Sequence, residues 1–155
     1  MPRPPGDRYH SDVRVLAVDL GLRRIGIAIS DASATLARPL EVIEARGAAA
    51  QLDRVAGLID RVGADEDGLA CVVVGLPRRL DGTPNEQTAA VLAFVEALKA
   101  RVSQAIVLQD ERLSSVEAES RLALNDRDWR SRKKKLDAAA AAVILQDYLN
   151  RGRAE

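Results

Sequence analysis

The sequence predicts an α/β protein with one mixed β-sheet, in which three antiparallel strands come first, parallel strands follow, and helices flank both faces. Two short Val- and Ile-rich segments separated by a glycine-containing turn predict a hairpin at the start. Helical patterns then alternate with apolar runs, which is typical of parallel strands. Because 155 residues suffice for one buried core, we expect a single domain over residues 13–150, between a disordered tail at 1–12 and a C-terminal tail at 151–155.

The first three predicted elements are strands. Residues 13–19 and 25–30 form the hairpin, and residues 40–44 add a third strand. The next segment, AAAQLDRVAGLIDRVGA, carries apolar residues at helical spacing and precedes the continuous apolar run 69–74. We therefore expect a helix that leads into a buried strand.

The second half of the chain contains three predicted helices and one further strand. A capping-box pattern at Thr83 predicts a helix that reaches about Val102. The apolar segment AIVLQD is the next strand, and a second capping-box pattern at Ser114 predicts a helix to about Leu124. The segment LDAAAAAVILQDYLN predicts a last helix, which Asp137 opens after a polar, basic loop.

Composition limits the classes of function. Cys71 is the single cysteine and lies in an apolar run, so no disulfide framework or thiolate metal cluster can form within one chain, and a reducing cytoplasm is the expected location. No apolar segment approaches the roughly 20 residues that span a bilayer, so we expect no membrane partner. The 23 basic and 23 acidic residues cancel, so nucleic-acid binding would depend on a local basic patch.

Three acidic residues lie at the ends of apolar elements. Asp19 ends the first strand, Glu111 follows the strand AIVLQD, and Asp137 continues the apolar stripe of the last helix toward the sheet. Each acid taken alone is better explained by an ordinary turn or cap. Three such acids in one chain are harder to explain in this way, because burying a carboxylate costs free energy unless a positive charge compensates it. Without a second cysteine or a usable histidine, the three acids indicate an oxygen-ligand site for Mg²⁺ or Mn²⁺.

Such a site suits phosphodiester hydrolysis. Two divalent ions about 4 Å apart activate a water molecule and stabilise the leaving oxygen of an in-line displacement. On this hypothesis Asp19, Glu111 and Asp137 are both the metal ligands and the catalytic residues of a nuclease, and two ions are bound when the substrate is present.

Four segments carry motifs in a fixed order: VDLGLRRIGIAISD, VVVGLPRRLDGTPNEQT, DERLSSVEA and LDAAAAAVILQDYL. Together they resemble the YqgF/RuvX family of Holliday-junction-resolvase-like proteins, also regarded as pre-16S rRNA nucleases, over about residues 13–150. The resemblance implies an RNase H-like fold and a metal-binding acid trio that falls on Asp19, Glu111 and Asp137. The residues that match the first family motif are Gly21, Arg24 and Gly26.

Basic residues near the acids predict the path of a nucleic acid. The segment from Arg121 to Lys135 holds seven basic against two acidic residues, and Trp129 within it offers a face for base stacking. The loop GLPRRLDGTPNEQT ends at a helix N-terminus, where backbone N–H groups and an arginine would hold a phosphate. A solvated loop and simple turn chemistry also explain these two segments. The predicted nucleic-acid contacts are Arg24, Arg78, Arg79, Arg112, Trp129, Arg130, Arg132, Lys133, Lys134 and Lys135.

Three classes of function stay open. The favoured class is a metal-dependent endonuclease that processes the 5′ end of pre-16S rRNA in ribosome biogenesis, with Holliday-junction resolution in DNA recombination as its alternative. True resolvases of this superfold place a further acid within a turn of the last one, whereas alanines follow Asp137, which disfavours junction resolution. A non-catalytic nucleic-acid-binding module is the second class.

The third class is an ATP-binding protein of the actin and sugar-kinase type, in which a DxG turn serves as a phosphate loop. That class requires a second glycine-rich phosphate loop and a second domain around the nucleotide, and 155 residues contain neither. The sequence leaves a homodimer open for every class.

Overall fold

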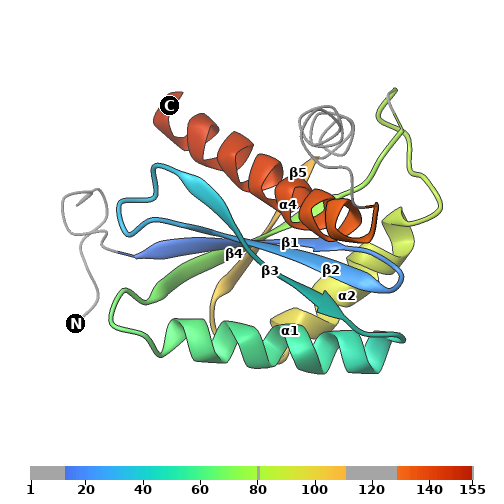
Figure 1. Ribbon diagram of the computed structural model, residues 1–155, viewed down its shortest axis with the longest axis horizontal. Coiled ribbons are helices and arrows are strands. Elements are labelled where there is room, and N and C mark those ends of the chain that lie inside the picture. The colour runs from blue at the N-terminus through green and yellow to red at the C-terminus, as the bar shows by residue number, and fades with distance from the viewer. Residues whose placement is uncertain (1–12, 80, 111–128, 155) are drawn as a thin grey trace.

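The computed structural model describes residues 13–79, 81–110 and 129–154. Figure 1 shows a β-sheet with α4 on one face and with α1 and α2 on the other. The elements are β1 (Arg14–Leu20), β2 (Arg24–Ser30), β3 (Ala37–Glu44), α1 (Ala48–Gly63), β4 (Leu69–Leu76), α2 (Thr88–Lys99), β5 (Ala105–Asp110) and α4 (Trp129–Ala154).

The five strands form one sheet in the order β3-β2-β1-β4-β5. The pairs β1–β2 and β2–β3 are antiparallel, whereas β1–β4 and β4–β5 are parallel. The predicted fold class is therefore confirmed. Since only β2 runs in the opposite direction, β1, β3, β4 and β5 all end, and β2 begins, along one edge of the sheet. We call this edge the carboxyl edge.

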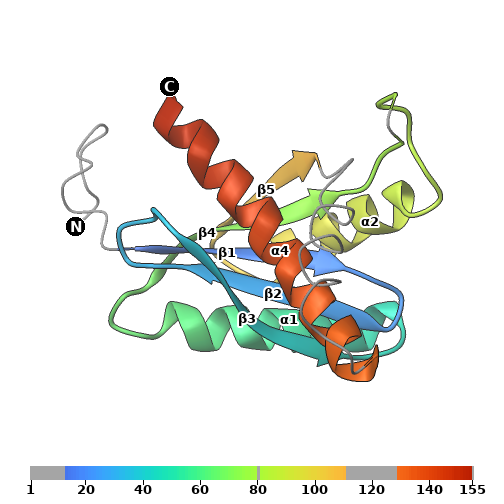
Figure 2. The ribbon, with the colours of Figure 1, turned by 45° about the horizontal axis from the view of Figure 1, so that its top comes forward.

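Apolar clusters of different composition cover the two faces. The cluster under α1 and α2 contains large, fully buried side chains such as Leu16, Ile27 and Ile59. The cluster under α4 includes small residues on the central strands, Ala17 and Ala28, beside larger side chains. Figure 2 shows α4 crossing the sheet on the side opposite to α1. Small side chains let a helix approach a sheet closely, so the backbone of α4 can come near the strands.

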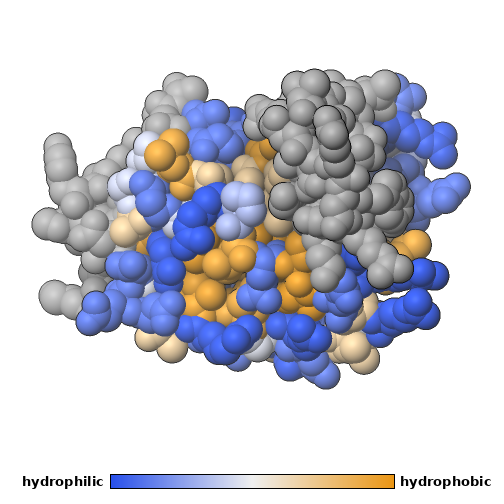
Figure 3. Space-filling model, in the orientation of Figure 1, coloured by the Kyte–Doolittle hydropathy of each residue, from blue (hydrophilic) through white to orange (hydrophobic). Residues whose placement is uncertain are grey.

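Strand β3 forms an outer edge of the described sheet and begins at Ala37, earlier than the predicted residue 40. Pro39 pairs with Ala28 beside a register shift, and an edge strand tolerates a proline because it needs no second hydrogen-bonding partner. Figure 3 shows hydrophobic residues gathered between α4 and α1, with hydrophilic residues bordering them. Along this outer strand, Pro39 and the charged residues beside it disfavour pairing with a strand of another molecule.

Helix α2 begins later than the sequence predicts, at Thr88 instead of near Thr83. The Thr83 hydroxyl donates to Asp81 at 2.7 Å, and the Thr83 carbonyl accepts the N–H of Arg79 at 2.9 Å, so Thr83 belongs to the preceding loop. Reciprocal hydrogen bonds form instead between Asn85 and Thr88, in the turn that leads into α2. Asn85 Oδ1 accepts the N–H of Thr88 at 3.1 Å, and Thr88 Oγ1 accepts the N–H of Asn85 at 2.9 Å.

Helix α4 begins earlier than predicted, at Trp129, so the segment from residue 129 to Lys135 is helical and not a loop. Asp137 therefore does not open this helix but lies in about its third turn. The reason is local: Arg, Lys, Leu and Ala favour helices, and neither glycine nor proline interrupts residues 129–137. The helix also extends to Ala154, into the expected C-terminal tail.

The helix predicted from Ser114 lies outside the described residues. Across the described ranges, no helix combines the length and the apolar character that crossing a bilayer requires.

Candidate active site

Asp19 lies at the carboxyl edge, on the face of the sheet that α4 covers. Val15 and Ala17 belong to the cluster under α4, and alternation along the strand gives Asp19 the same face. Asp19 is half-buried, and its partner on β2 is Gly26. A carboxylate at the end of an apolar strand thus faces α4.

Gly26 lets α4 lie directly on the sheet beside Asp19. A Cβ atom at Gly26 would overlap the carbonyl oxygen of Asp137 and would lie 2.6 Å from its carbonyl carbon. Directly paired residues of antiparallel strands share a face, with Cβ positions roughly 5 Å apart. The structure therefore makes Asp19 and Asp137 neighbours, although they come from opposite ends of the chain.

The side chain of Asp137 is held against the sheet. It is 31% exposed overall, and its Oδ2 atom is buried. The Arg24 guanidinium lies 3.9 Å from this oxygen through Nη1 and 4.0 Å from Oε1 of Glu44 through Nε. Ala141 and Ile144 on the same helical stripe are fully buried, which confirms that Asp137 continues the stripe toward the sheet. Arg24 supplies the positive charge that a partly buried carboxylate requires.

The donor atoms at this edge fit a hard divalent cation, because Asp19 and Asp137 offer carboxylate oxygens. Cys71 offers no competing soft ligand: burial raises the pKa of its thiol, which lies 3.8 Å from the hydroxyl of Tyr148. Over the described ranges, no three His, Cys, Asp or Glu side chains are grouped closely enough to hold a metal ion by themselves. The third predicted ligand, Glu111, lies outside these ranges.

Strand β5 directs a buried polar residue toward the same face. Val73 belongs to the cluster under α4 and pairs with Val107, so Gln109, two residues further along β5, faces the same side. Gln109 is only 4% exposed. The alternation predicts this face for Glu111 as well. Arg112, like Glu111, lies outside the described residues.

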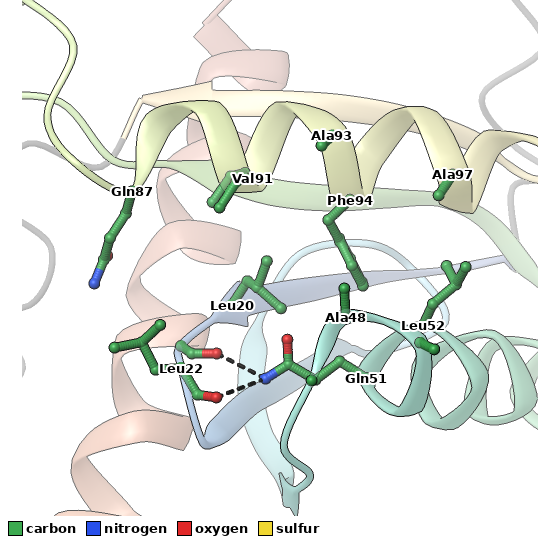
Figure 4. Close-up of a pocket in the computed structure, with 14 residues that line it drawn as sticks. Leu20, Leu22, Ala48, Gln51, Leu52, Gln87, Val91, Ala93, Phe94 and Ala97 are labelled. Atoms are coloured by element: carbon green, nitrogen blue, oxygen red, sulfur yellow. Dashed lines mark hydrogen bonds between the residues drawn. The ribbon is translucent and has the colours of Figure 1, made fainter.

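The β1–β2 turn is held from the other face by Gln51, which the sequence analysis missed. Its Nε2 donates to the carbonyl oxygens of Gly21 at 2.9 Å and of Leu22 at 3.1 Å, as Figure 4 shows, and to that of Ala45 at 3.1 Å. Gln51 is 7% exposed and lies in one stripe with Val55. The sequence did contain a signal for the role of Gln51, since it is a polar residue within the apolar stripe of α1.

Behind this turn, an apolar groove of about 550 Å³ lies between α1 and α2. Figure 4 shows Leu52 and Phe94 among its lining residues. Leu22, which is 81% exposed, stands at its rim. The groove belongs to the face under α1 and α2, so it is separate from the two aspartates.

The loop from β4 to α2 places Arg78 and Arg79 at the carboxyl edge. Both residues are exposed, and a bridge between Arg78 and Pro84 closes the loop. Figures 1 and 2 show this loop protruding beyond the end of β1. Asn85 already accepts two N–H groups at the start of α2, at 2.8 and 3.1 Å. The two arginines are therefore better placed than those backbone groups to contact a phosphate.

The remaining predicted contacts fall on the first turns of α4. Trp129 is its first residue, and Arg130, Arg132 and Lys133–Lys135 follow it along the helix. Their side chains lie outside the described part of the structure. The basic segment thus leads to Asp137 along a helix.

Comparison with known proteins identifies the family. A family model described as "RuvX: Holliday junction resolvase" matches residues 13–151. The chain belongs to the RuvX family. A relative from Desulforudis audaxviator named "Putative pre-16S rRNA nuclease" is 38% identical over 138 residues, covering 89% of this chain and 94% of the relative. A relative of the same name from Leifsonia xyli is 40% identical over 139 residues, covering 90% and 86%.

Solved structures confirm the fold of this RuvX-family chain. RuvC from Thermus thermophilus superposes with a TM-score of 0.51 at 17% identity, covering 90% of this chain and 97% of RuvC. T. thermophilus RuvC in complex with a Holliday junction substrate gives a TM-score of 0.51 at 15% identity. At such identities the likeness establishes the fold alone. It confirms the expected RNase H-like architecture.

Proposed function

We propose that this RuvX-family chain is a divalent-metal-dependent endonuclease that hydrolyses phosphodiester bonds in structured RNA, with the 5′ end of pre-16S rRNA as its substrate. The shared name of its curated relatives supports this substrate. Hydrolysis is supported above all by one observation, the convergence of Asp19 and Asp137 under α4 at the carboxyl edge.

In this proposal, Asp19, Asp137 and Glu111 hold Mg²⁺ or Mn²⁺. The bound metal supplies Lewis acidity at the phosphodiester and at the attacking water. Asp19 and Asp137 project from a strand and a helix in contact with each other, so their positions are fixed before the substrate binds. Rigid placement of charged groups reduces the reorganisation that the reaction requires.

Two sets of arginines support the acids. Arg24 lies beside Asp137 and keeps that carboxylate directed toward the sheet. Arg78 and Arg79 project from the β4–α2 loop at the same edge, where they bind phosphates of the substrate and orient the strand across the acids. Such orientation speeds the reaction because the reacting groups are already held in the required geometry.

The proposal is tested by cleavage of a pre-16S rRNA fragment that carries its 5′ extension, with Mg²⁺, with Mn²⁺ and with a chelator. We expect metal-dependent cuts by the wild type. We expect a loss of at least about 100-fold in Asp19→Asn, Glu111→Gln and Asp137→Asn, because each variant removes a charged oxygen ligand. RNA binding should persist in all three variants.

Asp147→Asn is the matched control for Asp137→Asn, since it makes the same change at an exposed position of the same helix. It should cut like the wild type. Equal cleavage by the wild type and Asp19→Asn, or cleavage that survives the chelator, would rule out this mechanism. Binding without any cutting by the wild type would favour a non-catalytic module.

A Holliday junction is the second candidate substrate, and the description of the matching family model favours it. The sequence after Asp137 runs through alanines to Ala142 and lacks the further acid expected of a true resolvase. A four-way DNA junction in the same assay decides between the substrates. Symmetric cuts in the junction, with the rRNA fragment left intact, would replace RNA processing by junction resolution.

A further inference from the structure

A concave basic surface lies beside the acids at the carboxyl edge. It has a volume of about 330 Å³ and is lined by Arg23, Arg24, Glu44, Ala45 and Arg46. The N–H of Ala45 donates to the carbonyl oxygen of Arg23 at 3.0 Å, so the β1–β2 turn and the β3–α1 connection form its walls together. Three of its five lining residues are arginines and one is acidic, so the concavity should attract an anion.

The arginines of this concavity differ from the basic residues of the fold that are held in short ion pairs. Arg14, Lys99 and Arg101 form ion pairs of 3.2, 3.4 and 2.8 Å with neighbouring carboxylates. Within the described residues, the side chains of Arg23 and Arg46 form no such pair. The contacts of Arg24 with carboxylates, at 3.9 and 4.0 Å, are too long to be hydrogen bonds. The N–H donors of Arg23 and Arg46 are therefore available to a ligand, and Arg24 keeps Nη2 in addition to the two nitrogen atoms that face carboxylates.

The concavity also lies at a useful distance from the acids. Arg24 begins β2, which neighbours the strand of Asp19, and Arg46 follows β3, the next strand outward. Since neighbouring strands are about 4.8 Å apart, the concavity lies about 5–10 Å from the end of β1. Arg78 and Arg79 lie on the other side, after β4. Basic residues thus flank the two aspartates in both directions along one edge.

We propose that Arg23, Arg24 and Arg46 bind a backbone phosphate next to the phosphodiester that is cut, so that the strand crosses the carboxyl edge between this concavity and the β4–α2 loop. This inference rests on the proposed function, because it positions the substrate of the same site. Guanidinium groups suit this role, since they bind phosphate through paired N–H donors and stay charged at every physiological pH.

The test is RNA binding measured without metal, so that no cleavage occurs. Fluorescence anisotropy of a labelled RNA stem-loop, at several salt concentrations, compares the wild type with the double variant Arg23→Gln, Arg46→Gln. We expect affinity to fall by roughly tenfold, and the slope of log K against log salt to fall by about 1–2, because phosphate contacts release counterions.

A matched double variant, Arg61→Gln with Arg151→Gln, removes the same charge from exposed positions near the C-terminal ends of α1 and α4. It should keep the wild-type slope. A site variant that unfolds at the wild-type temperature but binds RNA with the wild-type affinity and slope would overturn the inference. So would a loss no larger than that of the matched variant, which would reflect overall charge alone.

Inorganic phosphate, compared with chloride at equal ionic strength, tests whether the concavity recognises phosphate itself. We expect phosphate to displace RNA from the wild type more than chloride does, and this excess to disappear in the double variant Arg23→Gln, Arg46→Gln. An excess of equal size in both proteins would place the phosphate contact elsewhere and overturn the inference. Phosphate that binds the wild type but leaves the bound RNA in place would assign the concavity to free phosphate and also overturn it. A wild type that binds RNA but never cuts would overturn the nuclease, while the salt slope would still decide the phosphate site.

Discussion

The face of the sheet under α1 and α2 buries large branched side chains, whereas the strands under α4 also contribute small residues, Ala17, Ala28 and, beside Asp19, a glycine. Large side chains maximise apolar burial but keep a helix backbone away from the strands. Small ones give up burial and bring the main chain of Asp137 onto β2. The comparison teaches that both faces stabilise the fold, and that the small strand residues of the second face also let α4 position the acids.

The largest expected effect on stability comes from emptying the first face. Ile59 is fully buried in α1, so Ile59→Ala should lower the free energy of unfolding by about 2–5 kcal/mol through lost burial and a cavity. Cleavage per folded molecule should not change, because α1 packs opposite to the acids. Denaturant unfolding and cleavage below the melting temperature measure the two quantities. A cleavage rate that falls more than the fraction of folded protein would contradict the claim that the face under α1 and α2 does not position the acids.

Gly26→Ala tests the second face. The added Cβ would collide with the main chain of Asp137, so α4 must move outward. We expect a loss of about 1–3 kcal/mol in stability from overpacking, together with a loss of cleavage, since Asp137 leaves its place beside Asp19.

Gly57→Ala is the control for this change, because a Cβ at this position of α1 would meet nothing within 4 Å. It should raise stability by about 0.5–1 kcal/mol and leave cleavage unchanged. Full activity in Gly26→Ala would contradict the claim that close packing of α4 positions the acid.

Gln51→Ala tests whether a residue on the face under α1 and α2 affects cleavage, because Gln51 holds the turn that follows Asp19. Loss of its bonds leaves carbonyl groups without a partner, so we expect about 1–2 kcal/mol lower stability and several-fold slower cleavage. Gln146→Ala is the matched control. Gln146 also ties a helix to a turn, through the N–H of Ala37 and the carbonyl of Thr35, but away from the carboxyl edge. Equal cleavage in the two variants would reject a positioning role for Gln51.

The fold could be predicted from the sequence because β1, β2, β4 and β5 each carry an apolar run and α1 carries apolar residues at helical spacing. The position of Asp137 toward the sheet also followed from its spacing to Ala141 and Ile144. Helix boundaries were less accessible. The capping-box pattern at Thr83 did not mark the start of α2, because Thr83 makes its hydrogen bonds within the preceding loop.

The candidate site was predictable only in part. Asp19 carried a local signal, a charge at the end of a buried strand. Gln51 and Arg46 carried weak signals, because their role depends on the approach of the β1–β2 turn to the β3–α1 connection. Such an approach arises from tertiary packing, which no local pattern encodes.

The smallest effect is expected far from the acids, at Asp31 in the β2–β3 turn. Its carboxylate accepts the N–H groups of Thr35 at 2.7 Å and Leu36 at 3.1 Å, and these bonds lower its pKa. Because the pKa of Asp31 is lower in the folded state, its ionised carboxylate stabilises the fold at pH values above the unfolded pKa of about 3.9. This stabilisation is lost as the pH falls through the lower pKa of the folded state.

Asp31→Asn should therefore melt slightly below the wild type near neutral pH and approach it at acid pH, with unchanged cleavage at neutral pH. The difference should stay small because Asp31 is exposed. Thermal melts across pH measure it. A difference that grows toward acid pH would contradict the assigned direction.

The central claim is that Asp19 and Asp137 meet under α4 to hold a hard cation. Anomalous diffraction from crystals of the protein grown with Mn²⁺ tests it most directly. We predict a Mn²⁺ peak at the carboxyl edge, within about 2–2.5 Å of a carboxylate oxygen from each residue, and its loss in Asp137→Asn. Mn²⁺ bound only elsewhere, or carboxylates that turn away from each other at saturating Mn²⁺, would contradict the account.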